Sequence, residues 1–331
     1  MQFDTLTFLL FFTIVLFVYW SLTRWSARKN LLLVASYIFY AAWNPFYVGL
    51  ILLSTLVDWW VVGRLLATTG LLKRRALLWL SLTVNLGLLG YFKYTNFLLD
   101  TFRDVLSTME LDYRVPTYDI VLPVGISFYT FQTLSYTIDI YRGKLDRHYP
   151  LRDFALFVSF FPQLVAGPIV RAAHFLPQTD TPRPLSADKF GLGAALVITG
   201  LFMKVVLADA FLAPASDMLF LLSAKVGALG AWYAAFSFGG QIFFDFAGYS
   251  TIAIGAAFML GFDIPENFRK PYAAIGFSDF WQRWHISLSS WFRDYLYIPL
   301  GGNRHGTIHS YRNLMLTMTI AGMWHGASWM F

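Results

Sequence analysis

Residues 5–23 read TLTFLLFFTIVLFVYWSLT, a stretch without one charged side chain. A helix needs about 20 mostly apolar residues to cross the hydrocarbon core of a bilayer, so this stretch is long enough to span a membrane. Asp4 precedes it, no Lys or Arg stands before it, and no small-residue cleavage site follows it. It therefore lacks the signature of a cleavable signal peptide, and we expect it to remain as a first membrane helix.

Similar uncharged runs recur along the chain. They occupy residues 30–57, 76–92, 120–138, 154–170, 226–244, 246–262 and 313–331. The 331 residues are 57% hydrophobic and 13% charged, whereas a soluble domain carries about 25% charged residues. That composition excludes an ordinary soluble fold. We expect a polytopic, all-α membrane protein with about 8 to 10 membrane helices or re-entrant segments.

Prolines and charges predict where some runs are interrupted. Asn44-Pro45 should divide residues 30–57 into two shorter helices, because proline cannot continue a helix cleanly. Residues 190–211 should also span, although Lys204 and Asp209 interrupt them. No repeat and no linker between soluble domains is evident, so residues 1–331 are expected to form one membrane domain.

Two further segments are expected to be irregular. Phe161–Pro168 (FPQLVAGP) places two prolines and a glycine inside an apolar run. Irregular backbone at membrane depth is tolerated where it is buried in protein or lines a cavity. We interpret residues 154–170 as a re-entrant hairpin, with an ordinary proline kink as the alternative. Leu122–Gly125 (LPVG) indicates a second break.

Lysines and arginines gather in the loops between the apolar runs. The main groups are Arg24, Arg28 and Lys29; Arg64 and Lys73–Arg75; Arg142, Lys144, Arg147 and Arg152; and Arg269, Lys270, Arg283, Arg293, Arg304 and Arg312. Basic loops of membrane proteins face the cytoplasm, which places the N-terminus outside. The net charge of +6 is spread over these loops, so it does not indicate a nucleic-acid partner.

His325 is the first candidate for chemistry. It lies inside the otherwise uncharged run 313–331, and an ionisable side chain at membrane depth is a functional-site hypothesis by default. Its ordinary pKa near 6.5 suits a general base. A hydrogen-bonded histidine that packs helices is the alternative. The chain has no cysteine, which excludes a thiol nucleophile and cysteine metal sites.

His285 is the second candidate, within Phe277–Tyr295. On a helical wheel this segment shows one aromatic face and one polar face, as in a helix at the membrane interface. The aromatic face would hold Trp281, Trp284, Leu288, Trp291 and Tyr295, and the polar face Arg283, Ser287, Ser290 and Asp294. His285 falls at the edge of the aromatic face. A pure interfacial anchor, without a chemical role for His285, is the alternative.

The other ionisable residues give weaker hypotheses. His305 and His309 are four residues apart and could face a metal from one helix turn, but no third ligand is evident and solvated loop histidines are favoured. His148 and His174 are read as loop residues. Asp139 and Asp245, at the ends of apolar runs, are expected to be buried carboxylates paired with Arg or Lys.

Several motifs resemble those of the membrane-bound O-acyltransferase family. They are LPVGISFYTFQTLSYTIDIYRG (residues 122–143), FFPQLVAGPIVR (160–171), PENF (265–268), FWQRWHISLSSWFRDYLYIPLGGN (280–303) and MWHG (323–326). The resemblance covers most of the chain. It implies a fold with N-terminal helices at residues 1–95 and a family core at residues 120–331. Within the family, the chain is most similar to the membrane subunit of bacterial alginate and polysaccharide O-acetylation.

The resemblance also implies roles for single residues. The family's invariant histidine matches His325 and its second histidine matches His285, which makes both candidates for catalysis. Further candidates for substrate binding come from the same two motifs. They are Arg283, Trp284, Ser287, Arg293, Asn303 and Trp324.

The implied reaction moves an acetyl group from a cytoplasmic thioester such as acetyl-CoA towards a periplasmic acceptor, for O-acetylation of an alginate-like exopolysaccharide. His325 would be the general base, and neither a bound cofactor nor a metal is implied. Implied partners are the lipid bilayer, a periplasmic acetyltransferase and a polysaccharide biosynthesis complex. The implied location is the bacterial inner membrane, with the N-terminus in the periplasm.

Two departures and two alternatives remain. Thr251 stands where the family often has an aspartate, and the chain ends at Phe331 where relatives continue, which indicates a C-terminally truncated protein. A transporter or flippase of polysaccharide precursors would also suit broken helices and charges at membrane depth. A catalytically inactive scaffold is the other alternative.

Overall fold

The computed structural model describes residues 1–111, 116, 118, 120–221 and 227–330. Within these ranges the chain is helical and contains no strand. The elements group into two compact units, Met1–Val48 with Ala155–Ser287, and Gly49–Phe154 with Leu288–Phe331. The prediction of a single domain stays a prediction.

The first unit begins with α1 (Leu6–Ser21) and α2 (Trp25–Ala41). The remaining elements of the unit are η1 (Pro45–Tyr47), the end of α6 (Leu151–Ser159), α7 (Phe161–Leu164), α8 (Ala172–Phe175), η2 (Leu176–Thr179), α9 (Ala187–Leu201), the π-helix η3 (Phe202–Leu212), α10 (Ala213–Leu221), α11 (Ala228–Met259), η5 (Pro271–Ala273) and α12 (Gly276–Trp281). Phenylalanine rings join α1, α2 and α7, with the Phe161 ring 5.4 Å from that of Phe11 and 5.8 Å from that of Phe39.

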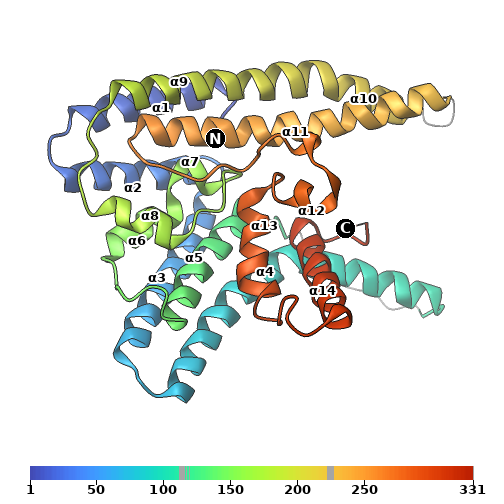
Figure 1. Ribbon diagram of the computed structural model, residues 1–331, viewed down its shortest axis with the longest axis horizontal. Helices are drawn as coiled ribbons and strands as arrows, with labels where there is room; N and C mark the ends of the chain where they lie inside the picture. The colour runs from blue at the N-terminus through green and yellow to red at the C-terminus, as the bar shows by residue number, and fades with distance from the viewer. Residues whose placement is uncertain (112–115, 117, 119, 222–226, 331) are drawn as a thin grey trace. The chain divides into compact units, whose positions relative to one another are not determined.

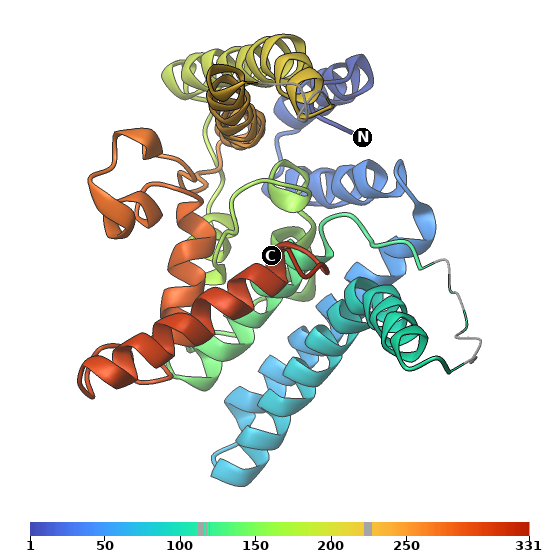
Figure 2. The ribbon, with the colours of Figure 1, turned by 90° about the vertical axis from the view of Figure 1, so that its right-hand side faces the viewer.

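The second unit contains the hairpin of α3 (Val48–Ala67) and α4 (Leu71–Thr108), whose helices leave the connecting turn at an angle in Figure 1 and follow the same diagonal in Figure 2. It also holds α5 (Ile126–Tyr141), the start of α6 (Leu151–Ser159), α13 (Ile286–Phe292), the π-helix η6 (Arg293–Tyr297) and α14 (Thr307–His325). Asp58 of α3 is fully buried and accepts hydrogen bonds from Ser81 and Asn85 of α4. That network fixes the hairpin from within.

Four helices in the described residues are long and apolar enough to cross a membrane: Pro45–Ala67, Leu71–Thr108, Ala187–Leu221 and Ala228–Met259. Helix α1 is apolar but shorter. Four is fewer than the about 8 to 10 segments expected, because the other apolar runs form shorter or broken helices. The helical membrane fold itself is confirmed.

The predicted interruptions have different outcomes. The break at Asn44-Pro45 is confirmed, since α2 ends at Ala41 and a 3-10 turn starts at Pro45. The break in residues 154–170 is also confirmed, since α6 and α7 are short and residues 165–170 leave the helix. Leu122–Gly125 does not break a helix but precedes one, because α5 begins at Ile126. The two uncharged runs on either side of Asp245 belong to one helix, since α11 continues through Asp245.

Helices α9 and α11 lie side by side and antiparallel (Figure 1) because paired glycines let their backbones touch. A Cβ atom on Gly200 would lie 2.6 Å from the Gly248 carbonyl oxygen, and one on Gly255 would lie 2.5 Å from the Gly193 carbonyl oxygen. Each helix therefore contributes two glycines seven residues apart to one face. Close approach through small residues is a common basis of helix packing in membranes.

A charged cluster lies next to these glycines. Lys204 sits at the middle of the helical stretch Ala187–Leu221, and its Nζ lies 2.6 Å from an Asp245 carboxylate oxygen and 2.9 Å from Asp209 Oδ1. Residues five apart on an α-helix point about 140° away from each other. The π-helix η3 brings Lys204 and Asp209 to the same face.

Candidate functional site

His285 does not lie within one amphipathic helix, so the prediction of a helix over Phe277–Tyr295 is wrong. Helix α12 ends at Trp281, α13 begins at Ile286, and His285 between them has a left-handed backbone with φ of 44°. That conformation costs a non-glycine residue about 1–3 kcal/mol and persists only where the surroundings enforce it.

Main-chain hydrogen bonds on both sides of His285 enforce this break. The Arg269 amide donates to the Arg283 carbonyl at 2.9 Å, and the Ile286 amide donates to the Asn267 carbonyl at 2.9 Å. Residues 267–269 thus pair with residues 283–286 much as two short strands would. A helical wheel cannot detect this pairing, because the partner segment lies elsewhere in the chain.

The Asn267 side chain joins three parts of the first unit. It is 1% exposed, its Oδ1 accepts from the Ser287 amide and hydroxyl at 3.3 and 2.9 Å, and its Nδ2 donates to Ser250 Oγ of α11 at 3.2 Å. The Ser287 hydroxyl in turn accepts from the Ile169 amide at 2.9 Å. Ser287, predicted to bind substrate, therefore anchors the irregular segment that follows α7.

The His285 imidazole is buried, with 2% of its residue surface exposed, and packs edge-on against Phe246 at 4.7 Å between ring centroids. Trp284 stacks on Phe280 at 5.6 Å. Arg283 forms an ion pair with Asp279 at 2.7 Å. The structure thus brings Arg283, Trp284, His285 and Ser287 together around the bend after α12.

His325 is the last residue of α14 and is exposed. Two side chains of α4 bind the carbonyl groups just before it: Lys93 Nζ donates to the Trp324 carbonyl and Tyr94 OH to the Met323 carbonyl. The final carbonyls of a helix have no partner within the helix, so these contacts cap α14. Helix α4 therefore fixes the backbone position from which His325 projects.

Trp324 is buried beside His325. It is 8% exposed, and its ring lies 5.4 Å from Phe128 and 5.7 Å from Phe131 of α5. The other two candidates of this unit lie at its surface. Arg293 is paired with Asp294 at 2.7 Å, and Asn303 is exposed in the turn after η6.

Sequence reasoning missed Lys93 and Asn267. Lys93 follows the apolar run 76–92 directly, which indicated the end of a membrane helix, whereas α4 continues to Thr108. Asn267 belongs to the PENF motif, but no role was assigned to it. In both cases the contact that gives the residue a role comes from a distant part of the chain.

The two predicted buried carboxylates have mixed outcomes. Asp245 is paired with Lys204 as expected, but its side chain is 51% exposed rather than buried. Asp139 is buried at 4% exposure and accepts a hydrogen bond from Tyr295 at 2.7 Å. In the described residues its hydrogen-bond partner is this phenol, so the predicted Arg or Lys partner is wrong.

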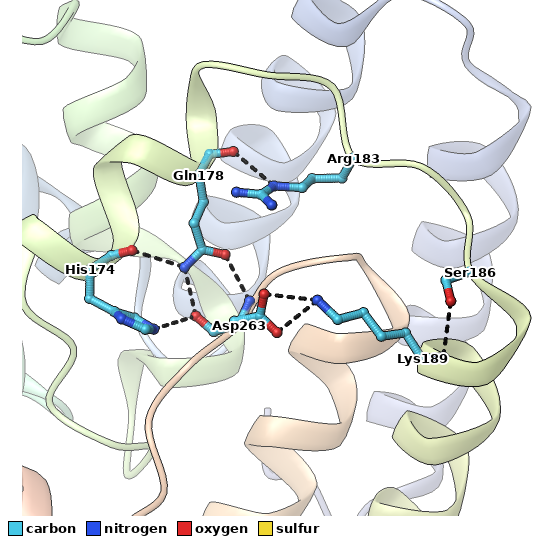
Figure 3. Close-up of polar contacts among 6 residues, drawn as sticks. All are labelled: His174, Gln178, Arg183, Ser186, Lys189 and Asp263. Atoms are coloured by element: carbon cyan, nitrogen blue, oxygen red, sulfur yellow. Dashed lines mark hydrogen bonds and ion pairs between the residues drawn. The ribbon is translucent and has the colours of Figure 1, made fainter.

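The remaining histidines serve structural contacts. Figure 3 shows His174 donating to the Asp263 carbonyl at 3.0 Å, beside Gln178, which donates to the same carbonyl at 2.8 Å. Lys189 closes this network with an ion pair to Asp263 at 2.7 Å (Figure 3). The network ties the connection between α8 and α9 to the end of α11.

The loop assignment holds for His148, whose ring lies against Trp59, but His174 lies in the short helix α8 and His309 in α14. The rings of His305 and His309 are 6.4 Å apart. No group of three metal-binding side chains occurs in the residues that the structure describes.

Comparisons with known proteins agree with the motifs. The model of the membrane-bound O-acyltransferase (MBOAT) family matches residues 141–331. The probable alginate O-acetylase of Azotobacter vinelandii is 43% identical over the whole chain, which spans 66% of that relative. For the protein of the same name from Pseudomonas putida the identity is 42%, and the chain spans 68% of it.

A more distant relative is named for a different substrate. The peptidoglycan O-acetyltransferase of Helicobacter pylori is 38% identical over 92% of the chain, which spans 61% of that relative. The chain thus spans about two thirds of the length of these relatives. On the match of its family model and of its relatives, the chain belongs to the membrane-bound O-acyltransferase family.

Proposed function

We propose that this protein is an acyltransferase that moves an acetyl group from cytoplasmic acetyl-CoA towards a periplasmic acceptor, for O-acetylation of an alginate-like exopolysaccharide. Family membership and the names of the relatives support the reaction class. The observation that carries the proposal is His325, an exposed imidazole at the end of α14 whose backbone is fixed by α4.

His325 acts as the general base in this proposal. Its imidazole accepts the proton of the acceptor hydroxyl while the hydroxyl oxygen attacks the thioester carbonyl carbon. The new C–O bond forms and the C–S bond breaks. The His325 imidazolium then gives its proton to the departing thiolate, which leaves as the coenzyme A thiol. No covalent enzyme intermediate is needed, which agrees with a chain that has no cysteine.

His285 has a different place in the proposal. Its imidazole is buried and its backbone is strained, a combination that concentrates at functional sites. We propose that the reaction also depends on His285, and that Arg283, Trp284, Ser287, Arg293, Asn303 and Trp324 contribute to substrate binding.

The setting is proposed as the bacterial inner membrane, with the N-terminus in the periplasm, because the basic loops then face the cytoplasm. Those loops would attract the phosphates of coenzyme A. A periplasmic acetyltransferase that receives the acetyl group is the proposed partner, within a polysaccharide biosynthesis complex.

The test compares His325→Ala with His309→Ala, an exposed histidine of the same helix. Acetyl transfer from labelled acetyl-CoA and export of the polymer are measured separately. Loss of a general base should lower transfer by about 10²–10⁴-fold in His325→Ala, with export intact and His309→Ala close to wild type. Lost export with intact acetylation would instead support a transporter. A wild-type protein that transfers no acetyl would support an inactive scaffold.

A further inference from the structure

Lys93 carries a charge that the proposed mechanism has not used. It lies within α4, one of the helices apolar enough to span a membrane, and is 9% exposed. A buried ammonium group is costly unless another group compensates its charge.

Only weak compensation surrounds this ammonium group in the described residues. Its contacts there are the Trp324 carbonyl and the Trp324 ring, whose centroid is 5.6 Å from Nζ. No carboxylate of the described residues forms an ion pair with Lys93. The buried carboxylates of the same unit are engaged elsewhere, Asp58 with Ser81, Asp139 with Tyr295 and Asp153 with Arg152.

The C-terminal end of α14 compensates part of the positive charge of Lys93. A helix C-terminus carries about half a negative charge, and an aromatic ring attracts a cation through its face. The helix end and the ring compensate only part of the full positive charge of Lys93. A net positive charge therefore remains beside Trp324, the residue before His325. Its charge also acts on the His325 side chain.

Capping alone does not require this charge. Tyr94, the next residue of α4, binds the Met323 carbonyl with a neutral hydroxyl group. A neutral donor at residue 93 could bind the Trp324 carbonyl in the same way without the cost of burying an ion. The lysine therefore provides something beyond a hydrogen bond, namely a positive charge beside the exposed imidazole.

We propose that the Lys93 ammonium group stabilises the negative charge that develops on the acyl carbonyl oxygen during transfer at His325. This inference rests on the proposed function. As the acceptor oxygen bonds to the carbonyl carbon, the π electrons of the C=O bond move onto the oxygen, and the hydroxyl proton moves to His325. When the C–S bond breaks, those electrons re-form the carbonyl, and the proton leaves with the thiolate.

The test separates the charge of Lys93 from its capping role. Lys93→Gln keeps a donor for the Trp324 carbonyl but removes the charge, Lys93→Arg keeps a charge, and Tyr94→Phe removes a neighbouring cap without changing charge. The kcat and the KM for acetyl-CoA are measured for each purified chain in lipid nanodiscs, together with its melting temperature.

We expect Lys93→Gln to lower kcat about 100-fold with KM changed less than about threefold, as for loss of an oxyanion-stabilising group. Lys93→Arg should recover about tenfold of that loss, and Tyr94→Phe should lose at least about tenfold less kcat than Lys93→Gln, because it removes a cap without removing a charge. Lys93→Met is a second neutral variant, judged by the same criteria if Lys93→Gln does not fold.

Two outcomes would overturn the inference. One is a neutral variant whose kcat stays within about threefold of wild type. The other is an equal loss of kcat in Lys93→Gln and Tyr94→Phe, which would assign Lys93 to capping alone. An inactive wild-type protein would instead refute the proposed acyl transfer, so the two failures are distinguishable.

Discussion

The glycine pairs between α9 and α11 give a prediction whose size follows from the structure. In Gly200→Ala the new Cβ would lie 2.6 Å from the Gly248 carbonyl oxygen and 2.8 Å from the Ile252 amide nitrogen. Carbon atoms need about 3.5 Å from their neighbours, so the helices must separate by about 0.9 Å. The obstructing atoms are backbone and cannot rotate away. Overpacking of this kind costs about 1–3 kcal/mol.

Gly191→Ala is the matched control, since it lies on the same helix and a Cβ there meets nothing within 4 Å. Both substitutions gain the same helix propensity, about 1 kcal/mol, so their difference isolates the clash. Thermal unfolding of the two purified variants should place Gly200→Ala lower by about 2–4 °C for each kcal/mol. A Gly200→Ala protein that melts at or above the temperature of Gly191→Ala would refute the reasoning.

Three other predictions concern charge and strain. Lys204→Met leaves two carboxylates without their cation, whereas Asp245→Asn leaves the lysine paired with a remaining carboxylate, so Lys204→Met should melt at the lower temperature. His285→Gly should be about 1 kcal/mol more stable than His285→Ala in thermal unfolding, because glycine adopts φ of 44° without strain. The hydrogen bond from Arg283 lowers the pKa of Asp279 below its usual value. The ionised carboxylate therefore stabilises the fold above about pH 4, and this stabilisation is lost as pH falls through the lowered pKa. Asp279→Asn should therefore melt below wild type at pH 7, and the difference should shrink as pH falls below about 4. A difference that stays constant as the solution is acidified would contradict the assignment.

Local signals in the sequence predicted much of the fold. The helix break at Asn44-Pro45 follows from the covalent structure of proline, which acts wherever the residue stands. The irregular segment around Phe161–Pro168 follows for the same reason. Membrane character is likewise a sum over single residues, and it needs no knowledge of which helices meet.

Non-local contacts account for what could not be predicted. Helix α11 continues through Asp245 because Lys204, about forty residues earlier, neutralises it. The break before α13 depends on two hydrogen bonds, one accepted by the Asn267 carbonyl and one donated by the Arg269 amide. Neither partner is visible in the periodicity of the segment concerned.

The candidate site divides in the same way. His325 could be found because a lone ionisable residue in an apolar run is conspicuous in any sequence. Lys93 could not, since a lysine at the end of an apolar run is ordinary, and only the fold shows its ammonium group at the end of α14. Family motifs named His285 but did not indicate its strained backbone.

Main-chain hydrogen bonds, and not the His285 side chain, hold the backbone on both sides of residue 285. Amide and carbonyl groups hold residues 283 and 286, and every amino acid except proline supplies both. Position 285 can therefore exchange one side chain for another while the flanking residues keep their places. A related protein could evolve a different reacting group there, and an unnatural imidazole analogue introduced at this position would report on the site without displacing it.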